Sequence, residues 1–214
     1  TDSFNVAVGH EAGLLVTTAL RTTLIGGLAG DALTAGHYNV AVGYSALSSD
    51  TLGQSNVAIG YNSLTAQNFT TATDSYNVAV GHGSGASVTT GIHNTLIGGL
   101  AGDALTDADY NVAVGISALS ADTLGSRSVA IGRAALTSQN FTTATNAYNT
   151  AVGYSAGIQV TTGQLNTIIG GDAGDALTDA DKNTAVGYSA LSTDVRGSQS
   201  TAVGYQALFS QNFT

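Results

Sequence analysis

The sequence repeats itself three times at a fixed long interval. Residues 1–72 begin TDSFNVAVGH, residues 73–144 begin TDSYNVAVGH, and residues 145–214 begin TNAYNTAVGY. The third copy stops two residues short of the others. Self-similarity at a fixed interval is typical of architectures in which each repeat packs only against its neighbours. We therefore interpret the three ranges as units of one continuous structure.

Each unit divides again into four segments that begin with N/T/S-x-A/L/I-V/I-G. The spacings between successive segment starts are 17, 17, 17 and 21, and they recur in the same order. An interval of 17 is too short for helix-pair repeats and suits one turn of a β-solenoid. The twelve segments start at Asn5, Thr22, Asn39, Asn56, Asn77, Asn94, Asn111, Ser128, Asn149, Asn166, Asn183 and Ser200.

The composition of each segment favours strand over helix. Every segment carries glycine together with β-branched residues, and glycine costs about 1 kcal/mol relative to alanine inside a helix. Strings such as VAVG, TLIG and TAVG are typical of one short strand per turn. The sequence thus predicts an all-β fold, a parallel β-solenoid (β-roll or β-helix) of twelve turns.

Two strand positions suggest how this solenoid is covered. The fourth position is always Val or Ile, which predicts a continuous buried aliphatic stack. The third is Ala, Leu or Ile, so we expect the opposite face to be closely packed as well. A strand that is apolar on both faces needs cover on both sides, and one thin coil covers only its inside. We therefore expect self-association, most simply an intertwined or packed homotrimer, with copies also joining end to end as a fibre.

The other positions of each segment predict corners and local contacts. Glycine at the fifth position suits a corner with positive φ, and the small eighth residue suits a crowded second wall. The residue at the ninth position is Gly in the first two segments of each unit and Leu in the last two. Asparagine at the first position predicts a ladder of side-chain amides that bond to one another. The four extra residues after every fourth turn predict a protrusion that contains Phe69, Phe141 and Phe213, each packed on a neighbouring coil.

Charge and composition exclude several classes of partner. The formal net charge is −9, with 14 acidic residues and only five Lys and Arg, so nucleic acid is not expected as a partner. No stretch approaches the roughly 20 apolar residues that span a bilayer, so we expect no membrane insertion. The absence of Cys removes disulfides and thiolate metal sites.

Two stretches carry a resemblance to known families. NTAVGYSAL at residues 183–191 and TAVGYQALFS at residues 201–210 resemble the repeats of phage and prophage tail-fibre proteins. They also resemble the head repeats of trimeric autotransporter adhesins, whose left-handed parallel β-rolls use related N-x-V-A-I-G strings. The resemblance extends over the whole chain, although the turns here are longer than those of the adhesin pattern. It implies a trimer with the solenoid axes along a fibre.

Three local motifs favour structural roles over chemistry. Gly153–Gly157 satisfies G-x-S-x-G around Ser155, but Glu11 and Gly83 replace this serine in the other units. Ile97–Gly102 is similar to a phosphate loop, yet it has no Lys and recurs at Ile25. The N-x-T sequons at Asn68, Asn140 and Asn212 arise from the repeat itself, so a packed turn is preferred to glycosylation.

Acidic, histidine and tyrosine residues each allow more than one interpretation. A D-x-x-x-D-x-D spacing could gather oxygen ligands for calcium, but the first unit has Asp31 followed by Ala35 and Gly36, so solvated turn carboxylates are preferred. The four histidines share no ligand-like spacing and are expected to be exposed. Tyrosines at the sixth position could contact a glycan or pack between chains. The two aspartate sets are Asp103, Asp107, Asp109 and Asp175, Asp179, Asp181; the tyrosines are Tyr44, Tyr61, Tyr154, Tyr188 and Tyr205.

These features favour a structural protein over an enzyme. We assign no catalytic, cofactor-binding or metal-ligating residue, because Glu11 is the only Glu and a polysaccharide-degrading site needs paired carboxylates. The sequence predicts an extracellular or virion fibre segment, most simply a phage tail-fibre shaft or receptor-binding fibre. A bacterial cell-surface adhesin or extracellular filament is the alternative. A cell-surface glycan or receptor is the expected external partner.

Overall fold

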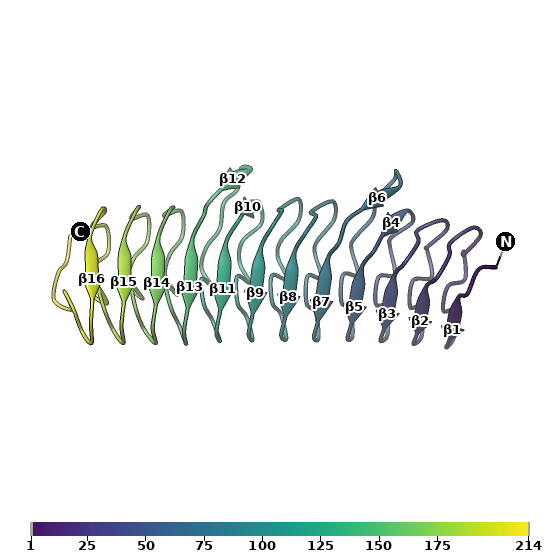
Figure 1. Cartoon of the computed structure of the whole chain (residues 1–214), viewed down its shortest axis with the longest axis horizontal. Coiled ribbons are helices and arrows are strands. Elements are labelled where there is room, and N and C mark those ends of the chain that lie inside the picture. The colour runs from purple at the N-terminus through teal and green to yellow at the C-terminus, as the bar shows by residue number, and fades with distance from the viewer. Residues whose placement is uncertain (1, 214) are drawn as a thin grey trace.

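The chain forms a straight rod of twelve stacked coils (Figure 1). The computed structural model describes residues 2–213, and no helix occurs among them. We number the coils 1 to 12 from the segment starts given above, and we number positions within a coil from that first residue. The prediction of an all-β parallel solenoid with twelve turns is confirmed.

Every coil contributes one three-residue strand to a single twelve-stranded parallel sheet. The third residue of each coil, which is the middle residue of its strand, pairs with the third residue of the next coil, as Ala41 does with Ala58. Neighbouring coils therefore stack in one register from end to end. In sheet order the strands are β1 (Val6–Val8), β2 (Thr23–Ile25), β3 (Val40–Val42), β5 (Val57–Ile59), β7 (Val78–Val80), β8 (Thr95–Ile97), β9 (Val112–Val114), β11 (Val129–Ile131), β13 (Thr150–Val152), β14 (Thr167–Ile169), β15 (Thr184–Val186) and β16 (Thr201–Val203).

The buried core lies between this sheet and a second wall. The third position points inward, so that Ala41, Leu24 and Ile168 are almost fully buried. The eighth position forms the facing wall, where Ala29 and Ser84 have no exposed surface. The prediction of a small residue in a crowded second wall is confirmed.

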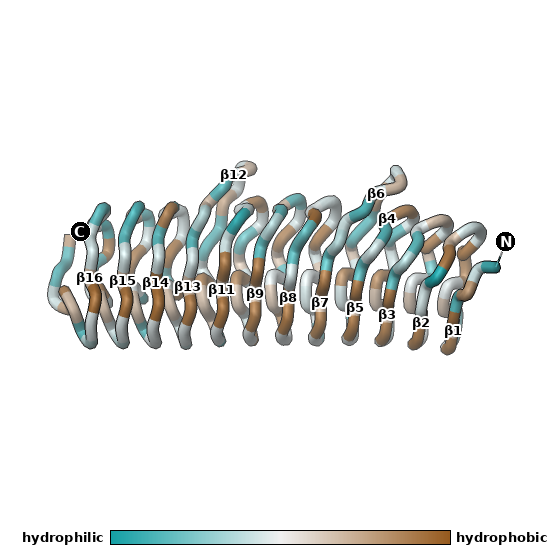
Figure 2. The backbone as a smooth tube through the Cα atoms, viewed as in Figure 1, coloured by the Kyte–Doolittle hydropathy of each residue, from teal (hydrophilic) through white to brown (hydrophobic). Residues whose placement is uncertain are grey.

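The prediction of a buried stack at the fourth position is wrong. Ile25, Ile97 and Ile169 are each 39% exposed, because side chains alternate across a strand and the third position already faces inward. The second and fourth positions instead form the outer surface of the sheet. Figure 2 shows the hydrophobic strand segments stacked along the whole rod.

The Gly and Leu residues at the ninth position match the inward residue of the strand. In coil 2 the strand carries Leu24, and a Cβ on Gly13 or Gly30 would lie 2.8 Å from its methyl groups. In coils 3 and 4 the strand carries Ala, and Leu47 and Leu64 fill the core from the other wall. The bulk of the core therefore moves from one wall to the other within each unit, while the cross-section stays filled.

First-position asparagines connect coils chiefly through the backbone. Asn39 Nδ2 donates to Gly53 O at 2.8 Å, and Asn39 Oδ1 accepts from the backbone N–H of Asn56 at 2.9 Å. Amide-to-amide contacts are longer, as between Asn94 Nδ2 and Asn77 Oδ1 at 3.4 Å. The predicted ladder of amides bonded to one another is thus corrected. These side chains bind the coils together mainly by satisfying main-chain groups.

Glycine at the fifth position turns the corner after each strand, as predicted. All twelve have positive φ, with Gly9 at 136°. A Cβ on Gly9 would also lie 2.5 Å from Gly26 O in the next coil. Both the backbone conformation and the close stacking of coils therefore require glycine here.

The four extra residues form the predicted protrusions (Figure 1). Each described protrusion ends in a two-strand parallel ladder, and Phe69 and Phe141 beneath them are only 6% and 5% exposed. Phe213, in the last coil, is 60% exposed, so the packing predicted for the phenylalanines holds for two of the three. The ladders pair β4 (Gly53–Gln54) with β6 (Thr73–Asp74), and β10 (Gly125–Ser126) with β12 (Thr145–Asn146).

Candidate functional site

The outer surface of the sheet is the most distinctive surface of the rod, and we call it the sheet face. Its centre consists of the second and fourth positions. On one side lies the leading row, which is the residue before each first position. On the other side lies the trailing row, which is the sixth position. The leading row is Phe4, Arg21, Tyr38, Ser55, Tyr76, His93, Tyr110, Arg127, Tyr148, Leu165, Lys182 and Gln199; the trailing row is His10, Gly27, Tyr44, Tyr61, His82, Gly99, Ile116, Arg133, Tyr154, Gly171, Tyr188 and Tyr205.

Every residue of the leading row has a left-handed backbone. The φ values lie between 49° and 64°, although none of these residues is glycine. The conformation is rare for bulky residues. It is held here by the preceding coil, since Tyr38 N donates to Leu20 O at 3.0 Å and Arg21 N donates to Ser3 O at 2.8 Å. Coil stacking therefore fixes the corner that presents this row to solvent.

Aromatic rings stack along both rows. In the leading row, Tyr76, His93 and Tyr110 have centroid separations of 5.4 and 4.9 Å, and Arg127 lies between Tyr110 and Tyr148 at 4.8 and 5.9 Å. Stacking at this separation covers the faces of the rings and leaves their edges and hydroxyl groups to solvent. A sugar cannot lie flat on a ring inside such a stack, which restricts how the tyrosines could contact a glycan.

The trailing row contains similar but shorter stacks. Tyr44, Tyr61 and His82 form one, with centroid separations of 5.8 and 5.2 Å, and Tyr188 and Tyr205 form another at 5.8 Å. The five sixth-position tyrosines identified from the sequence are all about half exposed or more. The leading row was not recognised in the sequence. Its signal was a bulky residue immediately before every first position except Asn56, which Ser55 precedes, at the same spacing.

The histidines are less uniformly exposed than the sequence suggested. His10 and His82 are exposed, whereas His93 is half-buried in the leading row. His37 is half-buried too, and its Nδ1 accepts from the N–H of Leu20 at 3.0 Å. The ring stacks of His82 and His93 and the hydrogen bond of His37 give these three residues structural roles.

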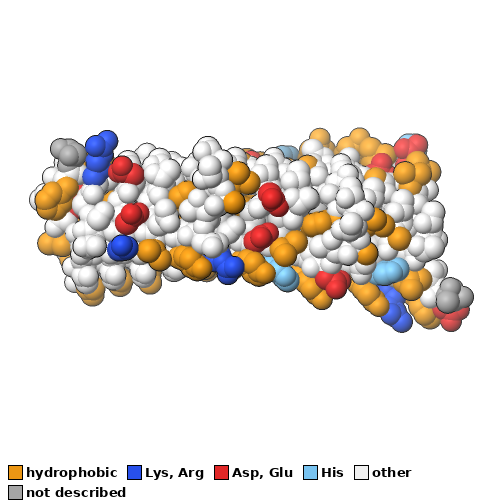
Figure 3. Space-filling view, turned by 90° about the horizontal axis from the view of Figure 1, so that it is seen from above, with side chains coloured by type: hydrophobic (Ala, Val, Ile, Leu, Met, Phe, Trp, Pro, Cys, Tyr) orange, Lys and Arg blue, Asp and Glu red, His pale blue; other side chains and the backbone are white. Residues whose placement is uncertain are grey.

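Charge is unevenly distributed over the rod. The sheet face carries all nine tyrosines and four of the five Lys and Arg residues, and none of the 14 acidic residues belongs to it. Figure 3 shows basic side chains among hydrophobic ones along one long edge, where a few acidic side chains also lie, with other acidic side chains on the adjoining turn surface. A chain with a net charge of −9 therefore has one surface that is locally basic.

A buried polar network lies at the twelfth position of coils 3 and 4. Asp50 is fully buried, and its Oδ1 accepts from the N–H groups of Gly53 and Phe69 at 3.0 and 3.1 Å. Its Oδ2 accepts from Gln67 Nε2 at 2.7 Å, and Gln67 Oε1 accepts from Asn77 Nδ2 at 2.9 Å. The network therefore holds the start of the protrusion, and a Cβ on Gly53 would collide with the carboxylate.

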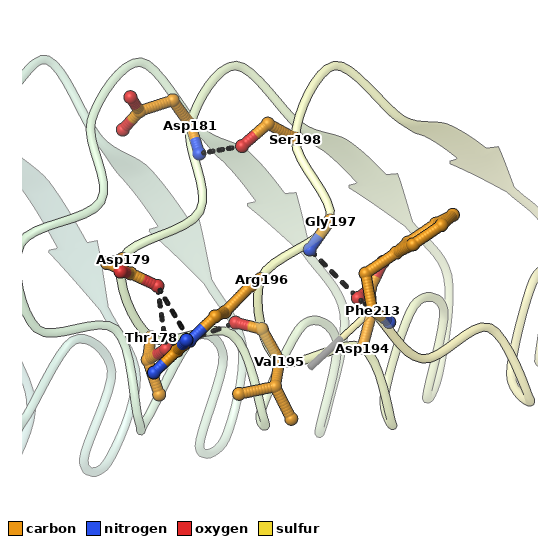
Figure 4. A network of polar contacts seen from close by, with 9 residues as sticks. All are labelled: Thr178, Asp179, Asp181, Asp194, Val195, Arg196, Gly197, Ser198 and Phe213. Atoms are coloured by element: carbon orange, nitrogen blue, oxygen red, sulfur yellow. Dashed lines mark hydrogen bonds and ion pairs between the residues drawn. The ribbon is translucent and has the colours of Figure 1, made fainter.

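The same network recurs around Asp122 and Asp194. Gln139 Nε2 donates to Asp122 at 2.6 Å, and Gln211 Nε2 donates to Asp194 at 2.7 Å. Figure 4 shows Asp194 with the N–H groups of Gly197 and Phe213. Sequence reasoning missed this site, although D-x-x-G at the same place in every unit was a visible signal.

The equivalent carboxyl groups of Asp50 and Asp194 differ in pKa. Burial raises the pKa of Asp50, and the hydrogen bonds from Gln67, Phe69 and Gly53 only partly oppose it. Burial also acts on Asp194, but the hydrogen bonds from Gln211, Phe213 and other backbone N–H groups outweigh it and lower its pKa. Asp194 lies in the last coil but one, so fewer protein atoms surround it.

The two aspartate sets considered for calcium do not converge. Asp107 Oδ1 accepts from Thr90 Oγ1 at 2.6 Å, and Asp109 Oδ1 accepts from Ile92 N at 2.8 Å. Asp175 and Asp181 are likewise bonded to Ser192 and Gln164, while Asp179 pairs with Arg196 at 3.7 Å (Figure 4). Within residues 2–213, no three His, Cys, Asp or Glu side chains are grouped as a metal site.

The other motifs noted in the sequence occupy structural corners. Ser155 is buried with φ 52°, and its N–H donates to Arg133 O at 3.0 Å. Of the glycines of Ile97–Gly102, Gly98 turns the corner, Gly99 belongs to the trailing row and Gly102 is at the ninth position. Asn68 and Asn140 of the sequons are exposed, and their Oδ1 atoms accept from Thr51 and Thr123 at 3.1 Å.

Comparison of the chain with protein-family models, with curated proteins and with solved structures finds no match. Among residues 2–213 there is also no helix of the length and hydropathy needed to cross a bilayer.

Proposed function

We propose that this chain is a non-enzymatic structural segment of a fibre, as in the shaft of a phage tail fibre. The observation that carries the proposal is the unbroken register of twelve coils in one sheet. At about 4.8 Å per coil they form a rod roughly 58 Å long. A stiff rod that is extended by adding identical units suits a part that spaces a receptor-binding region from a particle.

The sheet face supports assembly of three copies around a common axis. Its central rows carry Val, Ile and Thr side chains that are partly exposed, and parallel sheets normally have both faces covered. A homotrimer with the sheet faces turned toward the axis would cover these rows.

Glycines in the trailing row support close approach by another chain. Gly27, Gly99 and Gly171 recur in the second coil of each unit without positive φ. A Cβ on Gly99 would come no closer than 4.0 Å to His82 O, whereas a Cβ on Gly27 or Gly171 would lie 3.3 or 3.4 Å from the ring of the next tyrosine, so packing inside the chain leaves open space only at Gly99. Glycine at such a place is typical of a position where a second backbone approaches.

Localisation and the absence of catalysis belong to the same proposal. We place the fibre outside the cell or on a virion, with copies joined end to end. The non-enzymatic assignment draws support from Asp50 and Asp122, whose carboxylates are committed to backbone and glutamine donors. Asp107 and Asp109 of the turns each accept one hydrogen bond from the preceding coil.

A cell-surface adhesin or extracellular filament is the second candidate. It is favoured by the protrusions, which recur along one side of the rod and could offer repeated contacts to a surface (Figure 1). Immunogold labelling of intact virions and of cells separates the candidates. Label along tail fibres supports the first, and label confined to cell appendages supports the second.

Light scattering and electron microscopy of the purified chain test the assembly. We expect thin rods with a mass about three times 21.2 kDa. Ile97→Asp combined with Ile131→Asp should yield monomers with unchanged circular dichroism, because these side chains lie at the centre of the sheet face. Leu14→Asp with Leu15→Asp is the control, since these exposed leucines lie off the sheet face. A monomeric unaltered chain would contradict the trimer.

A further inference from the structure

Two arginines on coil 8 depart from the repeat at the same level of the rod. Arg127 in the leading row and Arg133 in the trailing row flank β11 on opposite sides. In units 1 and 3 the leading residue is Ser55 or Gln199, and the trailing residue is Tyr61 or Tyr205. The repeat alone therefore does not account for either arginine.

Both guanidinium groups are held in place but keep donors to spare. Arg127 stacks between two tyrosines, and its Nε donates to Asn146 Oδ1 at 3.0 Å. Arg133 lies 5.6 Å from the Tyr154 ring centroid, and its Nη1 donates to Tyr154 Oη at 3.2 Å. A guanidinium has five N–H groups, so most of the donors of each arginine remain available. Their fixed positions reduce the entropy lost on binding.

Neither arginine has an acidic partner in the described part of the chain. Within residues 2–213, the one ion pair that involves an arginine joins Arg196 to Asp179 on the turn surface. Asp109, next to the leading row, directs its carboxylate oxygen to Ile92 N. Another copy of the sheet face would bring more arginine and no carboxylate. A carboxylate that pairs with either arginine would therefore come from a different molecule.

We propose that coil 8 binds an acidic polysaccharide, with carboxylate groups of the glycan held by Arg127 and Arg133. A guanidinium matches a carboxylate through two parallel hydrogen bonds. A single small anion cannot satisfy both arginines of one copy, because they lie on opposite sides of a strand, whereas a polymer with regularly spaced carboxylates can. This inference deepens the proposed function by naming the class of surface ligand, and it rests on that function.

The site remains compatible with the proposed trimer. The leading and trailing rows are the two long edges of the sheet face. They would form the rim of the interface between copies, and the rim of an interface stays accessible to solvent. When three sheet faces surround one axis, the leading row of one copy lies beside the trailing row of the next. Arg127 and Arg133 of adjacent copies would then line one groove.

Isothermal titration of the full chain with polygalacturonate tests the site. We expect binding that weakens as salt is raised, and no binding of neutral dextran. Arg127→Ser and Arg133→Tyr introduce the residues that unit 1 carries at Ser55 and Tyr61, so the fold should persist. Each should weaken binding about tenfold, as loss of a charge-assisted pair does. Arg196→Leu is the control, because it removes the same charge and introduces the residue found at Leu52 and Leu124.

Several results would overturn the inference. These are absence of polygalacturonate binding, equal binding of dextran, or Arg127→Ser and Arg133→Tyr behaving like Arg196→Leu. If inorganic sulfate competed with polygalacturonate at the same affinity per charge, the site would be one for small anions. That result would overturn the proposal that it binds a polysaccharide. Light scattering on the same samples separates the two proposals. A trimer without binding rejects only the ligand, and binding by a monomer rejects only the assembly.

Discussion

The first and third coils of each unit follow one backbone path but differ at the twelfth position. In unit 2 this position is Val88 in coil 5 and Asp122 in coil 7, and both side chains are fully buried. Three residues after Val88, the N–H of Gly91 donates to Thr106 O in the next coil at 3.2 Å. Three residues after Asp122, the N–H of Gly125 donates to the carboxylate itself at 3.0 Å.

The difference shows where a solenoid buries a charge. An unpaired buried N–H costs about as much as a lost hydrogen bond, so an acceptor is needed where the next coil departs into a protrusion. Where the next coil has no insertion, its carbonyl groups satisfy the N–H groups and an apolar side chain fills the space. Backbone connectivity therefore decides which coils carry the aspartate.

The largest effect should follow from placing the carboxylate in the apolar corner. Val88→Asp would bury a carboxylate where the N–H of Gly91 is already bonded to Thr106 O, and we expect a loss of about 5 kcal/mol in stability, or unfolding of the central coils. Urea denaturation followed by circular dichroism measures the change. Val88→Ala is the matched control, which removes the packing without adding charge and should cost about 2 kcal/mol. A Val88→Asp chain as stable as the control would break the comparison.

The reciprocal change should cost somewhat less. Asp122→Leu leaves the N–H groups of Gly125 and Phe141 without an acceptor and removes one of the two acceptors of Gln139 Nε2, which keeps Ser128 Oγ, for a loss of about 3 kcal/mol. Asp122→Asn keeps one oxygen for the backbone donors and should lose about 1 kcal/mol. Hydrogen exchange at Phe141 should quicken in the leucine variant. Unchanged protection there would show that the carboxylate does not hold the protrusion.

The smallest effect concerns pH. Burial raises the pKa of Asp50 above 3.8, so its contribution to stability is present at low pH and is lost as pH rises through the raised value. The lowered pKa of Asp194 has the opposite sign: its contribution is present above 3.8 and is lost as pH falls through the lowered value. Carbon-13 titration of the two carboxyl groups should place their midpoints on opposite sides of 3.8. Identical midpoints would refute the difference in surroundings.

Prediction from sequence succeeded where a residue acts through its own geometry. Gly9 and its copies have the positive φ that their corner requires, and Ala29 and its copies fit the crowded wall. It failed for Ile97 and its copies, because both third and fourth positions were apolar and hydrophobicity alone could not tell which faces inward. The inward direction is set by Asn94, whose buried side chain satisfies backbone groups of Ala108 and Asn111.

The sequence by itself determined the period, the number of coils and the strand in each coil, because these follow from spacing and local propensity. Only the tertiary structure decided which face of the strand is solvent-exposed, which residues of different coils form the rows of the sheet face, and where aspartate is buried. Those features depend on groups far apart in the chain that meet only when coils stack, as Asp50 and Gln67 do. Contacts between coils, and not the strings within them, therefore give the rod its basic face and its polar corners.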